Sequence, residues 1–124
     1  MSQTQTFVDT LGVHSRTADD GTAHLELDAT EQHLNDAGTV HGGVLATLVD
    51  TAMGQAVRSR TGEDDVPATS QLTVTYLRPG TPGSLQVTGR VSRQGEHLTV
   101  CEADVEQDGR TLVHAVATFA VLHG

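Results

Sequence analysis

The chain has 124 residues, enough for one domain with a single hydrophobic core. Its net charge is −9, from 16 acidic and 7 basic residues, so nucleic acids and anionic membranes are poor partners. The single cysteine excludes an intrachain disulfide and a cysteine-rich zinc site, and a cytoplasmic location is expected. No apolar run is long enough for a membrane helix, and the start of the chain lacks the pattern of a signal peptide.

The basic residues are all arginine, and lysine is absent. An acidic surface without lysine is typical of proteins that work in high salt, where the ions screen the repulsion between like charges. A salt-loving source is therefore one hypothesis. GC-rich coding, which favours arginine over lysine, explains part of the composition equally well.

Three short segments precede the most apolar part of the chain. Among the first 20 residues, apolar positions 7, 8 and 11 predict a short helix docked on the domain. Residues 23–29 (AHLELDA) alternate between apolar odd and polar even positions, which is typical of a half-buried strand. Residues 30–40 are polar and predict a loop.

The central stretch predicts a long, buried helix. From Val44 onward the apolar residues fall at 44, 45, 48, 49, 52, 53, 56 and 57, which is the 3.6-residue period of a helix. This stripe spans roughly 220° of the helix surface, so other structure must wrap around it. Asp50 falls at the edge of the stripe, where a carboxylate is half-buried or faces a group that needs it. The helix opens with Gly42 and Gly43, whose amides have no intrahelical acceptor.

The helix is expected to run to about Arg60, with Gly62 as its stop in the acidic break at 61–65. The remaining residues predict an antiparallel sheet. Its strands are expected at 69–77, 85–91, 98–105 and 111–122, joined by a turn-rich link at 78–83 and by hairpin turns at 93–96 and 107–110. The last strand is apolar at nearly every position, which predicts cover on both faces. Together these elements predict an α+β fold in which an antiparallel sheet wraps around one long central helix.

Three segments of the chain resemble a known family. Residues 35–43 (NDAGTVHGG), 48–54 (LVDTAMG) and 69–79 (TSQLTVTYLRP) are similar to the hotdog-fold family, and within it to the PaaI-like acyl-CoA thioesterases. The order of elements matches over residues of about 20–122, so a single hotdog domain is expected over 1–124. The resemblance implies dimers that pair their sheets edge to edge, often assembled into tetramers. It also implies hydrolysis of acyl-CoA without metal or cofactor, and the seven histidines have no metal-ligand spacing.

Thioester hydrolysis suits the residues of these segments. The reaction puts negative charge on the carbonyl oxygen, and an amide at a helix N-terminus can hold that charge. The resemblance implies that the amide of Gly42 is this donor. Asp50 would attack the carbonyl carbon or activate a water. The resemblance further implies that Asn35 contacts the thioester region and that Thr69 positions water or substrate. His41 would orient the loop or contact the thioester sulfur.

Other residues are expected to bind the substrate. Gly43 and Ser70 adjoin two of the catalytic candidates. Coenzyme A carries phosphates, so Arg78, Arg93 and Arg90 are candidates by position to contact them.

The spacing of the two main candidates predicts an oligomer. Gly42 and Asp50 are eight residues apart, which is about 12 Å along a helix axis. They cannot both touch one carbonyl carbon within a single chain. If both act, they act across a two-fold interface between antiparallel central helices, which gives a dimer with two equivalent sites. The resemblance implies a dimer of dimers.

Simpler interpretations and two other functions stay open at this point. Asp50 can be a structural acid, Gly42-Gly43 a tight helix entry, Asn35 a turn residue and Thr69 a plain strand threonine. The same fold can serve as a non-catalytic acyl-CoA binding or regulatory module, or as an enoyl-thioester hydratase with a histidine opposite the acid. The acyl group, whether aryl or a short or medium chain, does not follow from the sequence.

Overall fold

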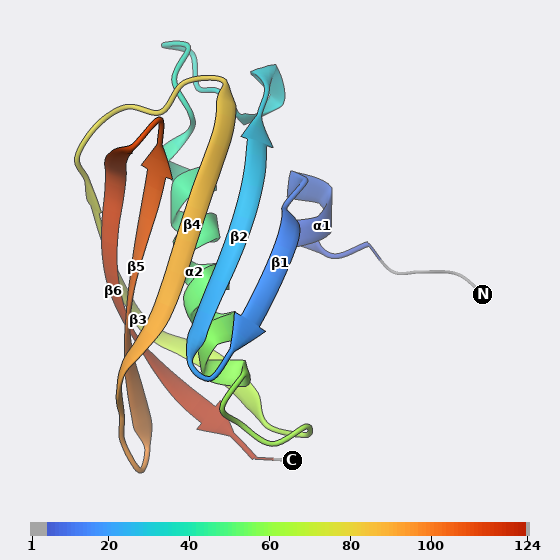
Figure 1. The fold of residues 1–124 in the computed structure, drawn as a ribbon, viewed down its shortest axis with the longest axis vertical. Helices are drawn as coiled ribbons and strands as arrows, with labels where there is room; N and C mark the ends of the chain where they lie inside the picture. Colours follow the sequence, from blue (N-terminus) through green and yellow to red (C-terminus); the bar gives the residue numbers. More distant parts are fainter. Residues whose placement is uncertain (1–4, 124) are drawn as a thin grey trace.

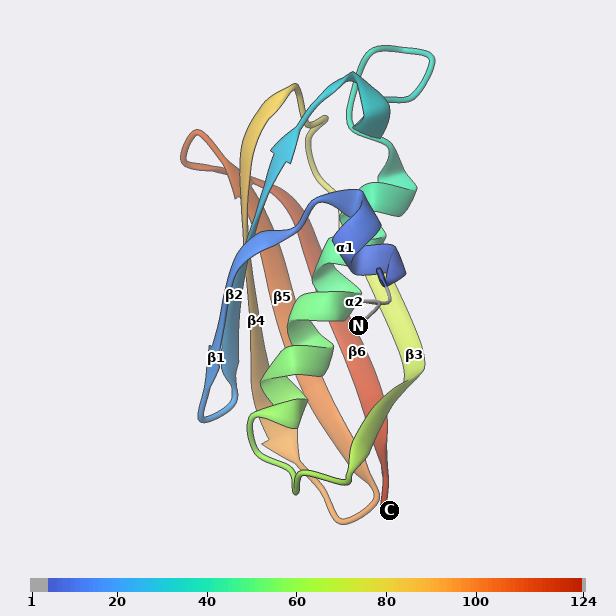
Figure 2. The same cartoon turned by 90° about the vertical axis from the view of Figure 1, so that its right-hand side faces the viewer.

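The computed structural model describes residues 5–123, the side chain of Ser15 apart. A six-stranded antiparallel sheet with strand order β1-β2-β4-β5-β6-β3 curves around one long helix, as predicted (Figures 1 and 2). Positions 1–4 and 124 of the predicted domain lie outside the described residues. The elements are α1 (Phe7–Leu11), β1 (His14–Asp19), β2 (Thr22–Ala29), the short 3-10 helix η1 (Glu31–His33), α2 (Gly42–Arg58), β3 (Val66–Tyr76), β4 (Gly83–Gln94), β5 (Leu98–Gln107) and β6 (Arg110–Leu122).

Helix α2 is the helix predicted from the apolar stripe, and it lies across the inner face of the sheet (Figure 2). It ends at Arg58, so the prediction that Gly62 stops it is wrong. The hydroxyl of Ser59 donates to the Ala56 carbonyl at 2.7 Å and accepts the Gly21 amide at 2.8 Å, which ends the helix without a glycine. The buried residues of α2 are Leu45, Leu48, Val49, Ala52, Met53, Ala56 and Val57. None of the helices within residues 5–123 has the length and hydropathy needed to cross a membrane.

Two tight hairpins are built on the dipeptide Asp-Gly. Asp108 and Gly109 have φ of 51° and 77°, as the mirror-image turn between right-twisted strands requires, and the predicted turn at 107–110 is confirmed. Asp20 and Gly21 have φ of 45° and 87° and join β1 to β2 in the same way. Strand β1 was not expected from its sequence. The predicted helix at 7–11 is present, with Val8 and Leu11 against the core.

The expectation that the last strand is covered on both faces is wrong for a single chain. Strand β6 turns Val113, Ala115, Ala117 and Phe119 toward α2, whereas Val116 on the outer face is 37 % exposed. Strand β3 forms one edge of the sheet, because within residues 5–123 it pairs only with β6. This edge of the sheet is therefore open in the single chain.

Helix α2 packs closely against Gly89 in β4. A Cβ at this position would lie 2.6–2.7 Å from backbone atoms of Ala52 and Met53 in α2. We expect Gly89→Ala to lower the free energy of unfolding by about 1–3 kcal/mol, because helix and strand must move apart. Urea unfolding measures this, with Gln86→Ala on the exposed outer face of β4 as control at about 0.5 kcal/mol or less. Equal stability of both variants would contradict the close packing.

Candidate active site

The N-terminus of α2 is shaped by His41. This residue is the N-cap, with an extended backbone, and its Nδ1 accepts the amide of Gly43 at 2.8 Å. A neutral ring that accepts at Nδ1 carries its proton on Nε2. The backbone amide of His41 donates to the His33 carbonyl at 2.8 Å, which fixes the entry of the chain into the helix. His41 therefore caps the start of α2, and its two expected roles, toward the loop or the thioester sulfur, stay predictions.

In the described part of the chain, one amide of the first turn of α2 has no acceptor. The first four amides of a helix have no intrahelical partner and need others. The Gly43 amide goes to the His41 ring, and the Val44 and Leu45 amides go to the His41 carbonyl at 2.9 and 3.3 Å. Among residues 5–123, the amide of Gly42 has no hydrogen-bond acceptor. It is the donor that the family resemblance implies for a developing oxyanion.

The carboxylate of Asp50 is oriented by Thr69. The Thr69 hydroxyl donates to Asp50 Oδ1 at 2.6 Å, so the structure brings these two predicted residues together. Asp50 is half-buried on α2, and no ion pair within residues 5–123 involves it. A structural acid is usually paired or fully hydrogen-bonded. The lack of a cationic partner does not favour the structural interpretation.

A β-bulge in β3 aims Thr69 at the helix. Leu72 and Tyr76 face α2, and strict alternation would turn Thr69 to the outer face. The register shifts between Thr69 and Gln71, so that Thr69 lies opposite the buried Phe119 and faces inward. Bulges often redirect side chains next to active sites.

Asn35 is engaged within its own loop. Its Oδ1 accepts the amides of Ala37 and Thr39 at 2.9 and 3.2 Å, and its Nδ2 donates to the Thr39 hydroxyl at 2.9 Å. This is an Asx turn, which Asn favours in loops. The structure does not bring Asn35 to Asp50 in the single chain.

Sequence reasoning missed His33 in the polar segment 30–40. Its side chain is buried, with Nδ1 accepting the Thr30 amide at 2.9 Å and Nε2 2.7 Å from the Leu11 carbonyl. Since its own carbonyl holds His41, His33 links the end of α1 to the start of α2. The only local signal is a threonine three residues before a histidine, a spacing that places the ring near the Thr30 amide.

A cavity of about 280 Å³ opens beside the helix N-terminus. It is lined by Val40, Gly42, Leu45, Tyr76, Leu77, Arg78 and Pro79. The lining is mostly apolar, with one arginine that donates to the Thr111 carbonyl at 3.1 Å. Of the three arginines predicted to bind phosphate, only this one lies near Gly42. The predicted Ser70 lies in the bulge and is exposed.

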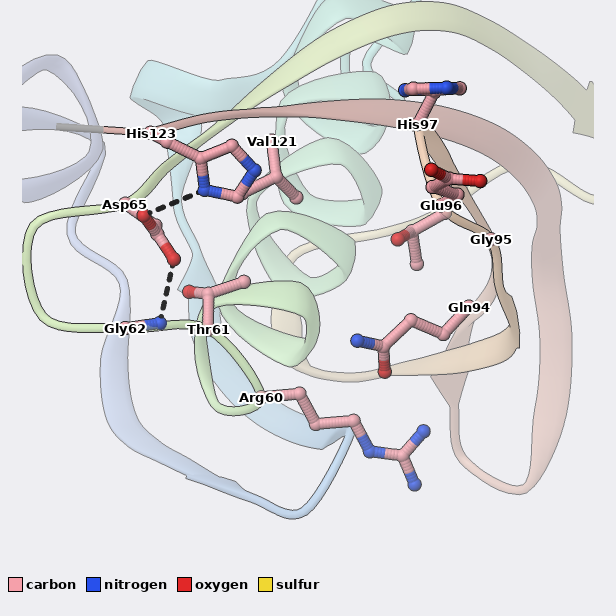
Figure 3. A pocket seen from close by; sticks show the side chains of 11 residues that line it. Arg60, Thr61, Gly62, Asp65, Gln94, Gly95, Glu96, His97, Val121 and His123 are labelled. Carbon is pink, nitrogen blue, oxygen red and sulfur yellow. Dashed lines mark hydrogen bonds and ion pairs between the residues drawn. The ribbon is translucent and has the colours of Figure 1, made fainter.

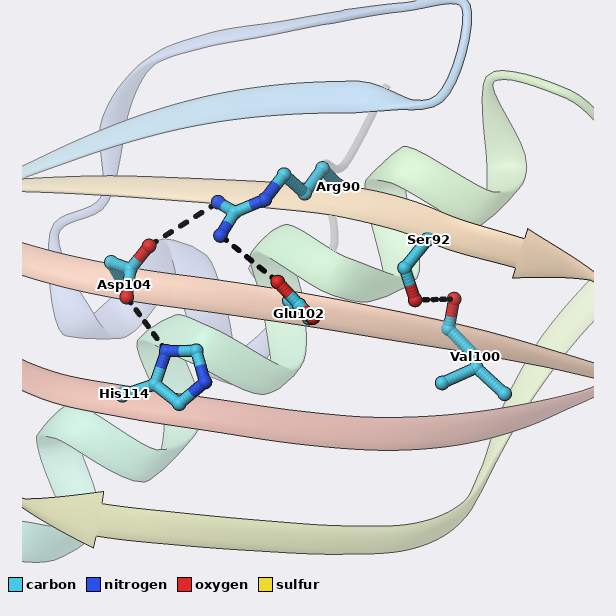
Figure 4. A network of polar contacts seen from close by, with 6 residues as sticks. All are labelled: Arg90, Ser92, Val100, Glu102, Asp104 and His114. Carbon is cyan, nitrogen blue, oxygen red and sulfur yellow. Dashed lines mark hydrogen bonds and ion pairs between the residues drawn. The ribbon is translucent and has the colours of Figure 1, made fainter.

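Arg90 lies on the outer face of the sheet, away from α2 (Figure 4). Its guanidinium is 3.1 Å from Glu102 and 3.2 Å from Asp104, and Asp104 also contacts His114 at 2.9 Å. The charge of Arg90 is therefore already balanced by carboxylates. Arg93 is exposed at the end of β4, beside the hairpin to β5.

A second cavity, of about 160 Å³, lies at the other end of α2 (Figure 3). It lies between Arg60 and Thr61 after the helix, the β4–β5 hairpin and the end of β6. Asp65 accepts the Gly62 amide at 2.9 Å and contacts His123 at 3.0 Å there. None of the residues predicted for the site lines this cavity.

Comparison with known proteins agrees with this fold. Residues 37–114 match the family model described as the thioesterase superfamily. The chain is 41 % identical over 100 residues to a provisionally named esterase of Halobacterium salinarum, and 33 % identical over 96 residues to the acyl-coenzyme A thioesterase PaaI of Escherichia coli. Each alignment covers 77 % of this chain and 66 % of the relative, so the chain spans slightly less than two thirds of these proteins. The solved structure of a conserved protein of Pseudomonas aeruginosa superposes with a TM-score of 0.90 at 30 % identity, covering 94 % of this chain and 93 % of that one.

Proposed function

The chain belongs to the hotdog-fold thioesterase superfamily, and on this premise we propose that it hydrolyses acyl-CoA to the free acid and coenzyme A. The observation that carries the proposal is the amide of Gly42 at the start of α2, which has no acceptor among the described residues. Hydrolysis moves negative charge onto the thioester carbonyl oxygen. A fixed amide at a helix N-terminus stabilises that charge. One good oxyanion donor lowers the activation free energy by about 3–4 kcal/mol.

Asp50 supplies the second part of the reaction. Its carboxylate either attacks the carbonyl carbon to form a mixed anhydride or removes a proton from the attacking water. The hydrogen bond from Thr69 holds one oxygen and leaves the other for this step. The thiolate of coenzyme A leaves readily, so no strong general acid is required.

The proposed active form contains two copies of the chain. Gly42 and Asp50 lie on the same helix, about 12 Å apart along its axis, so one chain cannot apply both to one carbonyl. Two antiparallel α2 helices would bring Gly42 of one protomer to Asp50 of the other. The open edge at β3 supports this arrangement, since Val66, Tyr76 and Leu77 at its ends are 48–52 % exposed. A dimer of dimers, as the family resemblance implies, stays a prediction.

A mixing experiment tests the shared site. Asp50→Asn and Gly42→Pro each remove one reacting group, and each variant alone is expected to be nearly inactive. Equal mixing with exchange of subunits makes half of the dimers mixed, and each mixed dimer holds one intact site of two. We expect about a quarter of wild-type activity to return, measured as thiol release after refolding the two variants together. The variants refolded separately and then combined without exchange are the control, and no recovery on exchange would contradict a site shared between protomers.

Arg78 is the best-placed residue to contact the phosphates of coenzyme A. It lines the cavity at the helix N-terminus and is exposed, whereas Arg90 is held by two carboxylates. The acyl group stays open between aryl and short or medium chains. The cytoplasmic location expected from the sequence also stays a prediction.

Release of free thiol from a panel of acyl-CoAs tests the proposed reaction. Burial raises the pKa of the Cys101 thiol to about 11, so the protein's own cysteine stays protonated and does not disturb a thiol assay. Turnover of some members of the panel supports the hydrolase and identifies the acyl class. Tight binding without turnover would favour the non-catalytic binding module. Loss of enoyl-CoA absorbance without thiol release would favour the hydratase.

The acidic composition predicts stabilisation by salt. With a net charge of −9 and no lysine, repulsion opposes folding at low ionic strength. The relative in Halobacterium salinarum supports the hypothesis of a high-salt protein. We expect the urea midpoint to rise as KCl increases from about 0.1 M to about 2 M, with a smaller rise in a Glu63→Gln, Asp64→Asn double variant that carries less charge. A midpoint that does not change with KCl would contradict the hypothesis.

A further inference from the structure

Tyr76 reaches across the structure to the start of the central helix. It is the last residue of β3, lies opposite Val113 on the inner face, and is the chain's only tyrosine. Its hydroxyl donates to the carbonyl of Gly42 at 2.8 Å, and its ring lines the cavity beside that residue. The sequence alone assigned Tyr76 no role.

This hydrogen bond is not needed to satisfy a buried group. Tyr76 is 51 % exposed, so water could serve its hydroxyl equally well. The Gly42 carbonyl is the first of the helix and accepts the amide four residues further on. We therefore expect the main effect of this hydrogen bond to be on the backbone conformation of Gly42.

The peptide unit between Gly42 and Gly43 is held at both ends. Tyr76 holds its carbonyl, and the His41 ring holds its N–H, which belongs to Gly43. Glycine has the greatest backbone freedom of all residues, and the first turn of a helix frays readily. Two successive glycines at this position would otherwise let the first turn rotate. The free N–H of Gly42 lies in the preceding peptide unit, whose His41 carbonyl accepts the Val44 and Leu45 amides. With both peptide units that flank Gly42 held, its φ and ψ are fixed, and with them the direction of its free amide.

We propose that Tyr76 is a positioning residue, whose hydroxyl holds the Gly42 carbonyl so that the Gly42 amide points at the developing oxyanion. The inference rests on the proposed thioesterase function. Tyr76 does not touch the reacting atoms in this role. Its contribution appears in the turnover step, because an oxyanion donor acts in the transition state and adds little to substrate binding.

Tyr76→Phe removes the hydroxyl and keeps the ring. We expect kcat for the best acyl-CoA of the panel to fall about 10- to 100-fold, since small displacements of a catalytic group are costly, with KM within about twofold of wild type. The matched control is Thr75→Val, which removes a hydroxyl from the adjacent residue on the outer face of the same strand. This control is expected to keep wild-type kcat and KM. An unchanged kcat in Tyr76→Phe would overturn the proposal.

Amide hydrogen exchange separates positioning from general stability. In Tyr76→Phe, exchange should accelerate at Gly43, whose amide is hydrogen-bonded to His41, and stay unchanged in the sheet, whereas a global loss of stability would accelerate it throughout. A double-mutant cycle with Gly42→Ala adds a second readout. If both substitutions act through the same peptide, the double variant loses less kcat than the product of the single losses, and independent losses would count against the proposal.

The failure of this inference and the failure of the proposed function give different results. If wild type hydrolyses no thioester of the panel, the proposed function fails, and with it the catalytic part of the inference. If wild type is active and Tyr76→Phe matches it in kcat and in exchange at Gly43, only the role of Tyr76 is wrong.

Discussion

Asp50→Asn is expected to lower kcat for thiol release from acyl-CoA by about 100-fold or more. The substituted amide is nearly isosteric but is neither a nucleophile nor a base. Its oxygen can still accept the Thr69 hydroxyl, so the local geometry should be retained. Loss of activity would then reflect the missing carboxylate and not a displaced strand. The measurement is steady-state thiol release at saturating substrate, with unfolding by urea as a check of the fold.

The control for Asp50→Asn makes the same chemical change at an exposed position. Glu63→Gln in the acidic turn after α2 is expected to keep wild-type turnover. Thiol release that survives in Asp50→Asn would exclude the proposed mechanism. The assignment of the fold would not be affected by that result. Rapid-quench kinetics of wild type divide the two roles of Asp50, because an accumulating mixed anhydride gives a burst of about one thiol per site before the steady state.

Gly42→Pro is expected to lower kcat by about 10²- to 10³-fold, because it deletes the amide assigned to the oxyanion. Proline has no N–H, and the first position of a helix is where it is best tolerated. The preceding His41 has ψ of 133°, in the extended region that a residue before proline prefers. No hydrogen bond within residues 5–123 is lost, since this amide has no acceptor there. The fold should therefore stay intact while activity falls.

Gly42→Ala distinguishes the loss of the amide N–H from the effect of added side-chain atoms, because Gly42→Pro makes both changes at once. Alanine keeps the N–H but places a Cβ 3.3 Å from the Tyr76 hydroxyl, which is tight. We expect a smaller loss of kcat in this variant than in Gly42→Pro, with similar thermal stability in both. Equal activities of the two variants would show that the amide of Gly42 contributes little and that only the space beside Tyr76 matters.

The parts of the fold that the sequence predicts are those whose signal is periodic. The apolar stripe of α2 and the alternation of β2 each repeat over several residues, and each is set by burial against one layer. Strand β1 has no such alternation, because it forms an edge of the sheet with mostly exposed side chains. Its signal was the turn at Asp20-Gly21, the same dipeptide that correctly predicted the turn at 107–110.

In the candidate site, too, the sequence predicts the residues that have a local signal and misses those that act through long-range contacts. Asp50 stands out because it lies at the edge of an apolar stripe, and Gly42 because a helix start leaves its amide free. Contacts that join distant segments leave no local pattern. The hydroxyl of Tyr76 reaches a residue 34 positions earlier, and His33 holds a carbonyl 22 positions earlier. Such pairs follow from tertiary packing, which a single sequence does not display.

The bulge in β3 makes the length of this strand as important as its composition. Deleting the extra residue Ser70 would restore regular pairing with β6, and Thr69 would still lie opposite Phe119 and face α2. A residue inserted between Gln71 and Tyr76 has the opposite effect, because with the bulge kept it shifts the earlier part of the strand by one position and turns Thr69 to the outer face. Asp50 would then lose its only side-chain partner among the described residues, although no residue in contact with it had been replaced. We therefore expect turnover to survive the deletion of Ser70 better than a one-residue insertion in the second half of the strand.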